Sequence, residues 1–107
     1  MNLTTMTATT QEQEAERKVL LENAEVVVIE TTYPPNTGVA MHEHRYQHVV
    51  YVVNGGTVQT SSPDGSVSTL ELHSGQTLWR NPQSHSTRNI GSTTYKVLEI
   101  EIKSAAR

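Results

Sequence analysis

The sequence predicts an all-β sandwich or barrel, and three observations support this prediction. From residue 18 onward, short runs rich in Val, Ile, Thr and Tyr recur along the chain. Gly, Pro, Asn and Asp separate these runs at near-regular spacing, which is typical of short strands joined by tight connections. No stretch repeats its apolar residues with a helical period. The length of 107 residues fits one small domain of this kind.

The chain before residue 18 has a different composition. It is rich in Thr and Gln as far as about Glu16, and it offers too little apolar surface to offset the entropy lost on ordering. We therefore expect a flexible N-terminal segment at residues 1–17 and the folded domain at residues 18–107. A short helix over residues 11–21 is an alternative for part of this segment.

Strands are expected wherever β-branched and aromatic residues gather between turn residues. Their expected limits are 18–22, 25–33, 38–43, 46–53, 56–61, 66–72, 76–80, 85–90 and 94–103. Antiparallel pairing is expected across two connections, Asn54 to Gly56 and Pro63 to Gly65, because both contain residues that tolerate positive φ in tight hairpins. In the last strand the apolar residues Leu98, Ile100 and Ile102 alternate with the charged residues Glu99, Glu101 and Lys103. We expect the charged set to face water on an outer sheet.

Composition and charge exclude several classes of function. The formal net charge is −3 and only 8 residues are Lys or Arg, so we expect no nucleic-acid partner and no anionic membrane surface as a partner. The absence of cysteine excludes disulfides, thiolate metal ligands and a cysteine nucleophile. The longest apolar runs are far shorter than the roughly 20 residues that cross a bilayer. The N-terminal residues lack the features of a signal or transit peptide, so a cytoplasmic location is expected.

Three of the five histidines, His42, His44 and His48, fall within seven residues. A helix would turn His42 away from the other two, whereas on extended backbone all three side chains point to one side. Val50 and Val52 share that side, which identifies it as the interior of the barrel. Buried imidazoles are costly unless their ring nitrogens have partners, and a divalent metal ion satisfies three at once.

Other polar residues are candidates for the same site. His85 is the fourth candidate ligand, because it opens a predicted strand after a proline-containing turn, whereas His73 lies in a turn and is expected outside the site. Tyr46 shares the parity of the histidines and is a candidate proton donor. Arg80 is a candidate anchor for a substrate carboxylate, and a surface arginine at a strand end is the alternative. Glu43 has the opposite parity and is expected to face away. Three further residues are candidates either for a substrate pocket or for the core: Met41, Tyr51 and Trp79.

The pattern around the first three histidines resembles the first of two motifs of the cupin superfamily. That motif consists of Gly, a spacer, His-x-His, three residues, usually Glu, six residues and Gly. Four residues match it, namely Gly38, His42, His44 and Gly55. His48 stands where Glu is usual.

The second cupin motif consists of Gly, five residues, Pro, then His, three residues and Asn. Gly75, His85 and Asn89 match this pattern. Pro82 falls one residue late and the internal glycine is replaced, so the turn before His85 is expected to differ in shape. The resemblance covers about residues 21–103.

The resemblance implies a double-stranded β-helix, which is the jelly-roll barrel of the cupins, with one divalent metal ion per chain. The chain looks like the small single-domain cupins that include beta-alanine degradation proteins. Its candidate ligands are similar to those of manganese-binding four-histidine cupins: His42, His44, His48 and His85. Fe or Mn is favoured, and Zn, Ni or Cu are alternatives, because nitrogen ligands select poorly among these metals. Small cupins commonly pair through the region of residues 18–33, so a homodimer is expected.

Two functions from different classes are compatible with such a site. Four neutral imidazoles would leave the full double charge on the ion, so a small anionic substrate is expected. The first hypothesis is a mononuclear Fe or Mn dioxygenase that acts on a small organic acid or a diketone-like substrate. Few carboxylates are expected inside the barrel to act as acids or bases, and this favours the dioxygenase slightly. The alternative is a non-redox cupin with Zn or Ni, either an isomerase or lyase or a protein that binds a small ligand.

Overall fold

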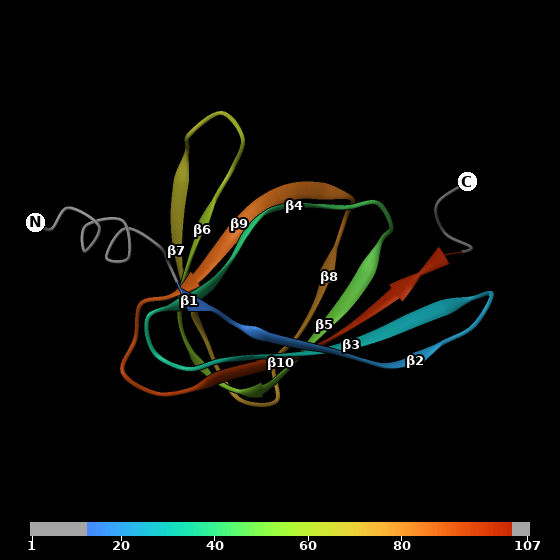
Figure 1. Ribbon diagram of the computed structural model, residues 1–107, viewed down its shortest axis with the longest axis horizontal. Helices are drawn as coiled ribbons and strands as arrows, with labels where there is room; N and C mark the ends of the chain where they lie inside the picture. The colour runs from blue at the N-terminus through green and yellow to red at the C-terminus, as the bar shows by residue number, and fades with distance from the viewer. Residues whose placement is uncertain (1–12, 104–107) are drawn as a thin grey trace, which may run out of the picture.

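The computed structural model describes residues 13–103, which form two five-stranded sheets (Figure 1). The strands are β1 (Gln13–Glu14), β2 (Glu16–Glu22), β3 (Val26–Tyr33), β4 (Thr37–His44), β5 (His48–Asn54), β6 (Gly56–Ser61), β7 (Val67–Leu72), β8 (Thr77–Arg80), β9 (Gln83–Asn89) and β10 (Tyr95–Ile102). One sheet has the order β1-β4-β9-β6-β7 and the other the order β2-β3-β10-β5-β8. The all-β prediction is confirmed. Residues 13–103 contain no helix that could cross a membrane.

The nine predicted strands are all present, and their limits differ from the predicted ones by at most two residues. The additional strand, β1, pairs in parallel with β4. The alternative of a helix over residues 11–21 is wrong for the described part, because β1 and β2 occupy it and β2 pairs along β3. Residues 1–12 lie outside the described residues, so the flexible segment remains a prediction there.

The hydrophobic core lies between the two sheets. β3 alternates regularly, because Val27, Ile29, Thr31 and Tyr33 are buried while the residues between them are half-buried. The main cluster of buried side chains consists of Tyr33, Val50, Val52, Val58, Leu72, Tyr95 and Val97. The burial of Val50 and Val52 confirms that the even-numbered residues of β5 face the interior.

The connection from Asn54 to Gly56 does not form the predicted hairpin. β5 and β6 belong to different sheets, so the chain crosses between the sheets at this point. None of the three residues has a positive φ. Gly55 is needed for another reason, since a Cβ on it would overlap the carbonyl oxygen of Leu72. The hairpin at Gly65 is confirmed, because β6 and β7 pair antiparallel and Gly65 has a φ of 92°.

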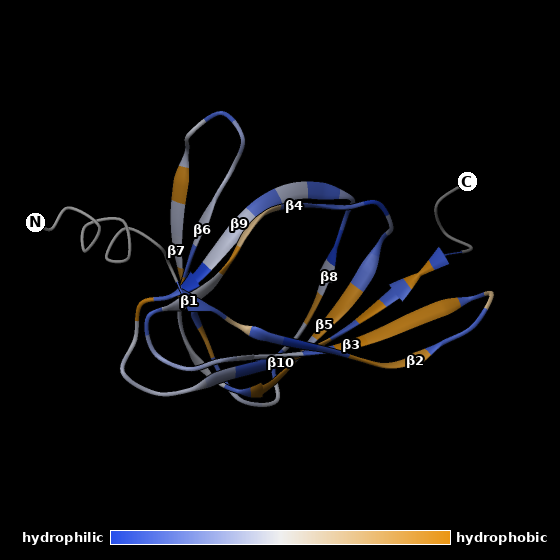
Figure 2. Ribbon diagram, in the orientation of Figure 1, coloured by the Kyte–Doolittle hydropathy of each residue, from blue (hydrophilic) through white to orange (hydrophobic). Residues whose placement is uncertain are grey.

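The faces of β10 are the reverse of the predicted ones. The strand alternates between apolar and charged residues (Figure 2), but it lies in the middle of its sheet, between β3 and β5. Glu99 pairs with the buried residues Ile29 and Val50, and Glu101 pairs with the buried His48. Directly opposite residues share a face, so both glutamates point into the barrel while Leu98 and Ile100 lie on the outer face.

Candidate metal centre

Four histidines from three strands meet inside the barrel, and we call them the histidine cluster: His42 and His44 of β4, His48 of β5 and His85 of β9. The ring of His44 lies at the centre of the cluster, because its centroid is 4.7 Å from that of His42, 4.5 Å from that of His48 and 4.9 Å from that of His85. His44 is 3% exposed and His48 is 1% exposed. The structure therefore brings the four predicted ligands together.

An irregularity in β4 aligns the cluster with β9. Val39 pairs with Thr87, but the next register pair is His42 with His85, so two residues of β4 face one residue of β9 between these pairs. This extra residue is a β-bulge, which changes the parity of the strand. Val39 and His42 therefore both line the interior, although one position is odd and the other even. The bulge places His42 directly opposite His85.

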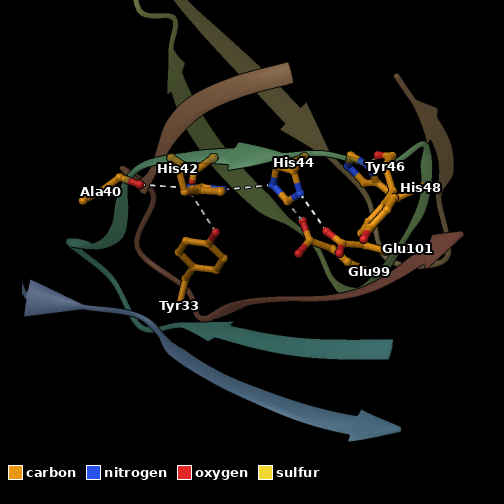
Figure 3. A network of polar contacts seen from close by, with 9 residues as sticks. Tyr33, Ala40, His42, His44, Tyr46, His48, Glu99 and Glu101 are labelled. Atoms are coloured by element: carbon orange, nitrogen blue, oxygen red, sulfur yellow. Dashed lines mark hydrogen bonds and ion pairs between the residues drawn. The ribbon is translucent and has the colours of Figure 1, made fainter. Parts of the chain in front are cut away.

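Three of the four rings are held through Nδ1 (Figure 3). The Nδ1–H of His42 donates to the carbonyl oxygen of Ala40 at 2.7 Å, and that of His48 donates to the carbonyl oxygen of Tyr46 at 3.0 Å. The Nδ1–H of His44 donates to Glu101 Oε2 at 3.0 Å. Such bonds set the tautomer and the orientation of metal-binding histidines, because they leave the Nε2 lone pair free.

The Nε2 atoms of His42 and His44 lie only 2.9 Å apart. With both Nδ1 atoms protonated, two neutral rings direct two lone pairs at each other, which is repulsive unless a cation lies between or beside them. Burial lowers the pKa of His44, partly offset by the hydrogen bond to Glu101, so a proton is disfavoured as that cation. A divalent metal ion would satisfy both nitrogens, and the donor set fits such an ion.

Burial favours the neutral form of two rings of the cluster, His44 and His85, because it lowers the pKa of both. The pKa of His85 is lowered to about 4, chiefly by burial and to a smaller extent by charge repulsion from the other three histidines and Arg80. Metal ions bind neutral imidazole, so a ring that is already neutral near pH 7 does not have to release a proton first.

Glu99 belongs to the site, although the sequence pattern placed it outside the barrel. Its Oε2 lies 3.8 Å from His44 Nε2, and its side chain is 15% exposed. The pKa of Glu99 is raised to about 7, chiefly by burial and to a smaller extent by the nearby Glu101, against a lowering by Arg17. One signal could have identified this face: Tyr95 and Val97 share the parity of Glu99, so apolar residues occupy the start of the same face.

The possible ligand atoms fall into two groups, each with all atoms within 4.8 Å of one another. One group is His42, His44 and His85, and the other is His44, His48 and Glu99. The predicted set of four histidines is thus divided between two overlapping groups that share His44. The second group contains a carboxylate that the predicted set lacked.

A cavity of about 60 Å³ adjoins the cluster. Its polar lining includes Arg17, His42, His48, Arg80, His85 and Glu99. Arg80 therefore lines the cavity, and its role as a substrate anchor stays a prediction. Arg17 of β2 adds a second guanidinium, although the sequence placed it in the flexible segment. Neither arginine forms an ion pair with another of residues 13–103.

Other candidate residues lie outside this cavity. Tyr46 is in the turn between β4 and β5, where strand parity no longer applies, and it contributes its carbonyl oxygen rather than its hydroxyl to the site. Met41, Tyr51 and Trp79 are 48%, 40% and 54% exposed, so they are neither core nor pocket residues. Glu43 is exposed, as predicted.

Asn89, the last residue of the second motif, has a structural role. It is fully buried, and its Nδ2 donates to the carbonyl oxygens of Tyr33 and Thr93 at 2.8 Å each. Its Oδ1 accepts a hydrogen bond from the backbone N–H of Gly91 at 2.9 Å. Asn89 therefore stabilises the turn after β9 and joins it to β3.

The chain is similar to known proteins in both sequence and structure, although no family model matches it. It is 30% identical over 86 residues to the beta-alanine degradation protein BauB of Pseudomonas aeruginosa, an alignment that covers 79% of this chain and 90% of that protein. A cupin domain from Bordetella pertussis Tohama I is 29% identical, with a TM-score of 0.81 over 87% of this chain and 97% of that one. A double-stranded β-helix protein of Klebsiella pneumoniae is 25% identical, with a TM-score of 0.70 over 88% and 81% of the two chains. The predicted double-stranded β-helix is confirmed.

Proposed function

The chain belongs to the cupin family, and we propose that it binds one divalent metal ion through the histidine cluster and acts on a small anionic molecule. The contact between His42 Nε2 and His44 Nε2 at 2.9 Å is the observation that carries this proposal. Two lone pairs at that distance need a cation, and burial disfavours a proton there. The remaining rings, His48 and His85, lie against the same two residues.

An anionic substrate is supported by the charges around the cavity. Arg17 and Arg80 come from the two edge strands of one sheet, β2 and β8, and both line the cavity. A guanidinium binds a carboxylate through two parallel hydrogen bonds, so these residues would bind and orient an organic acid. The small volume of the cavity favours a small molecule.

For the reaction, we propose a dioxygenase that uses Fe or Mn, acting on a small organic acid or a diketone-like substrate. A redox-active ion would supply the electrons that activate dioxygen. The residues of the chain would hold this ion, exclude water and position the anion. The apolar side chains that share the cavity, among them Val50 and Leu78, would keep bulk water away from the reacting atoms.

One observation favours the alternative, a non-redox cupin with Zn or Ni. The scarcity of carboxylates inside the barrel argued against acid-base chemistry, but Glu99 and Glu101 both point inward, and Glu99 lines the cavity. The pKa of Glu99 is raised to about 7, chiefly by burial, which suits a group that accepts and returns a proton near neutral pH. Isomerase or lyase chemistry is therefore better supported than the sequence alone indicated.

An oxygen-uptake screen separates the two reactions. Protein loaded with Fe or Mn is mixed with small acids and diketones in an oxygen electrode, and wild type is compared with His44→Ala and with His73→Ala. His73 lies in an exposed turn and serves as the matched control. Substrate-dependent oxygen uptake that is lost only in His44→Ala supports the dioxygenase. Conversion of a substrate without oxygen uptake supports the alternative.

We also propose that the protein forms a homodimer through the outer face of the sheet that contains β2. Register pairing places one row of apolar residues across all five strands of this face: Leu21, Val28, Ile100, Val49 and Trp79. Leu21 and Trp79, at the two ends, are 51% and 54% exposed. A contiguous apolar row of this length is typical of a surface that is covered in an assembly.

A further inference from the structure

We infer that Glu99 is a fifth protein ligand of the metal ion, an inference that rests on the metal binding proposed above. The histidine cluster alone accounts for the four predicted ligands. Glu99 comes from β10, a strand that contributes no residue to either sequence motif.

The carboxylate of Glu99 lies close to the nitrogen of His44 that is free to bind a metal ion. Its Oε2 lies 3.8 Å from His44 Nε2, which is the same atom that lies 2.9 Å from His42 Nε2. The Nε2 of His44 is thus the point toward which both a second imidazole and a carboxylate are directed. Figure 3 shows Glu99 reaching from β10 toward His44, beside Glu101.

The hydrogen bonds of His44 show that the two groups of ligand atoms belong to one ion. His44 is shared by both groups, and its Nδ1 already donates to Glu101 at 3.0 Å. Only its Nε2 is left for coordination, and one lone pair binds one ion. His44 therefore cannot serve two ions, so Glu99 and His48 would complete the coordination of the ion that His42 and His85 bind.

The Glu99 carboxylate has no hydrogen-bond donor among residues 13–103 to compensate its charge. The side chain of Glu99 makes no hydrogen bond with another of residues 13–103, and its one close polar contact is with His44. A largely buried carboxylate without donors is costly unless a cation compensates it. Glu101, in contrast, accepts the hydrogen bond from His44. The two glutamates therefore have different roles, with Glu101 orienting a ligand and Glu99 facing the ion.

The charge balance of the site also favours Glu99 as a ligand. Four imidazoles add no negative charge, and two arginines line the adjoining cavity. A divalent ion without an anionic ligand would leave a large positive charge in a partly buried site. At position 48, where cupins usually have Glu, this chain has His. Glu99, on a different strand, would supply the carboxylate ligand that position 48 lacks. A six-coordinate ion would then keep one free position rather than two.

Cobalt binding tests this inference without any need for a substrate. Metal-free protein is titrated with Co(II), and both the dissociation constant and the visible absorption spectrum are recorded for wild type, Glu99→Gln, Glu43→Gln and His44→Ala. Glu43 is exposed on β4, so Glu43→Gln controls for the loss of one carboxylate charge. We expect one Co(II) per wild-type chain and an affinity at least about tenfold weaker in Glu99→Gln. We also expect the absorption of Glu99→Gln to become more intense, as it does when the coordination number of Co(II) falls.

The outcomes separate this inference from the proposed function. If wild type binds one Co(II) and His44→Ala does not, but Glu99→Gln matches wild type in affinity and spectrum, Glu99 is not a ligand and the proposed function stands. If wild type binds no Co(II), the proposed metal binding is wrong, and the assignment of Glu99 as a ligand is wrong with it. Two ions per chain would overturn the single-ion assignment. If Glu99→Gln does not fold, the infrared difference spectrum of wild type decides, because a coordinated carboxylate shifts its stretching bands when Co(II) is added and an uncoordinated one does not.

Discussion

His44 and Glu101 join two strands across the interior of the barrel. The Nδ1–H of His44, on β4, donates to Glu101 Oε2, on β10, at 3.0 Å, and both side chains are largely buried. β4 and β10 belong to different sheets, so the bond connects the sheets as well as fixing the imidazole. The orientation of the central ring of the histidine cluster therefore depends on a residue outside both sequence motifs.

Replacement of Glu101 is expected to weaken metal binding. Glu101→Ala removes the acceptor that holds the His44 ring, and losses of such partners cost roughly 10- to 100-fold in metal affinity. Glu101→Gln keeps an acceptor oxygen without the charge, so it should recover part of the affinity. Competition with a chelator measures the dissociation constants. Equal affinities for wild type and Glu101→Ala would show that the bond does not position His44.

A glycine substitution tests the crossing between the sheets. In Gly55→Ala the new Cβ would overlap backbone atoms of Leu72 that cannot move aside freely, so we expect a destabilisation of about 1–3 kcal/mol. Gly91→Ala is the matched control, because a Cβ added to Gly91 would lie 3.4 Å from its nearest neighbouring atoms. Urea denaturation gives the free energy of unfolding of each variant. If Gly55→Ala is as stable as Gly91→Ala, the close approach at Leu72 is absent in solution.

Stability at alkaline pH should depend on Tyr33. Burial raises its pKa from 10.0 to about 12, against a smaller lowering by the hydrogen bond with Thr87. The folded state favours the neutral phenol, so this stabilisation is complete below pH 10 and is lost as the pH rises toward 12, by about 3 kcal/mol for two pKa units. Tyr33→Phe cannot ionise, so its free energy of unfolding should fall less over this interval. A parallel decline in both proteins would contradict the assignment.

The outer apolar row predicts the oligomeric state. Size-exclusion chromatography with light scattering should give a dimer for wild type and a monomer for Leu21→Glu, because a charge buried in an apolar interface is left without a partner. Val67→Glu is the control, since Val67 is 56% exposed on β7 of the other sheet. A monomeric wild type, or a dimer that survives in Leu21→Glu, would contradict the proposed interface.

The strands could be predicted because β-branched residues and turn residues mark them locally. Within β5 the parity of His48, Val50 and Val52 was sufficient to place these residues inside the barrel, because sequence shows the alternation of a single strand directly. His44 lies on β4, across the turn at residues 45–47, so its burial depends on the pairing of β4 and not on the parity of β5.

The inward face of β10 could not be predicted in the same way. Alternation separates Glu99 and Glu101 from Leu98 and Ile100, but it does not tell which set faces the interior. That depends on pairing with β3 and β5, which lie far away in the sequence. Glutamates are usually exposed, so this tendency predicted that Glu99 and Glu101 face water, which is wrong. The bulge in β4 and the crossing at Gly55 likewise depend on neighbouring strands rather than on local sequence.

The metal content of the purified protein tests whether the histidine cluster binds an ion. Untagged protein is purified anaerobically from cells grown with balanced metals, and plasma mass spectrometry measures the identity and the amount of each metal in wild type and in His44→Ala. We predict close to one divalent ion per wild-type chain, Fe or Mn for the proposed dioxygenase, and a large loss in His44→Ala. A metal-free wild type that takes up no added ion, or a His44→Ala variant that retains its ion in full, would contradict metal binding by the histidine cluster.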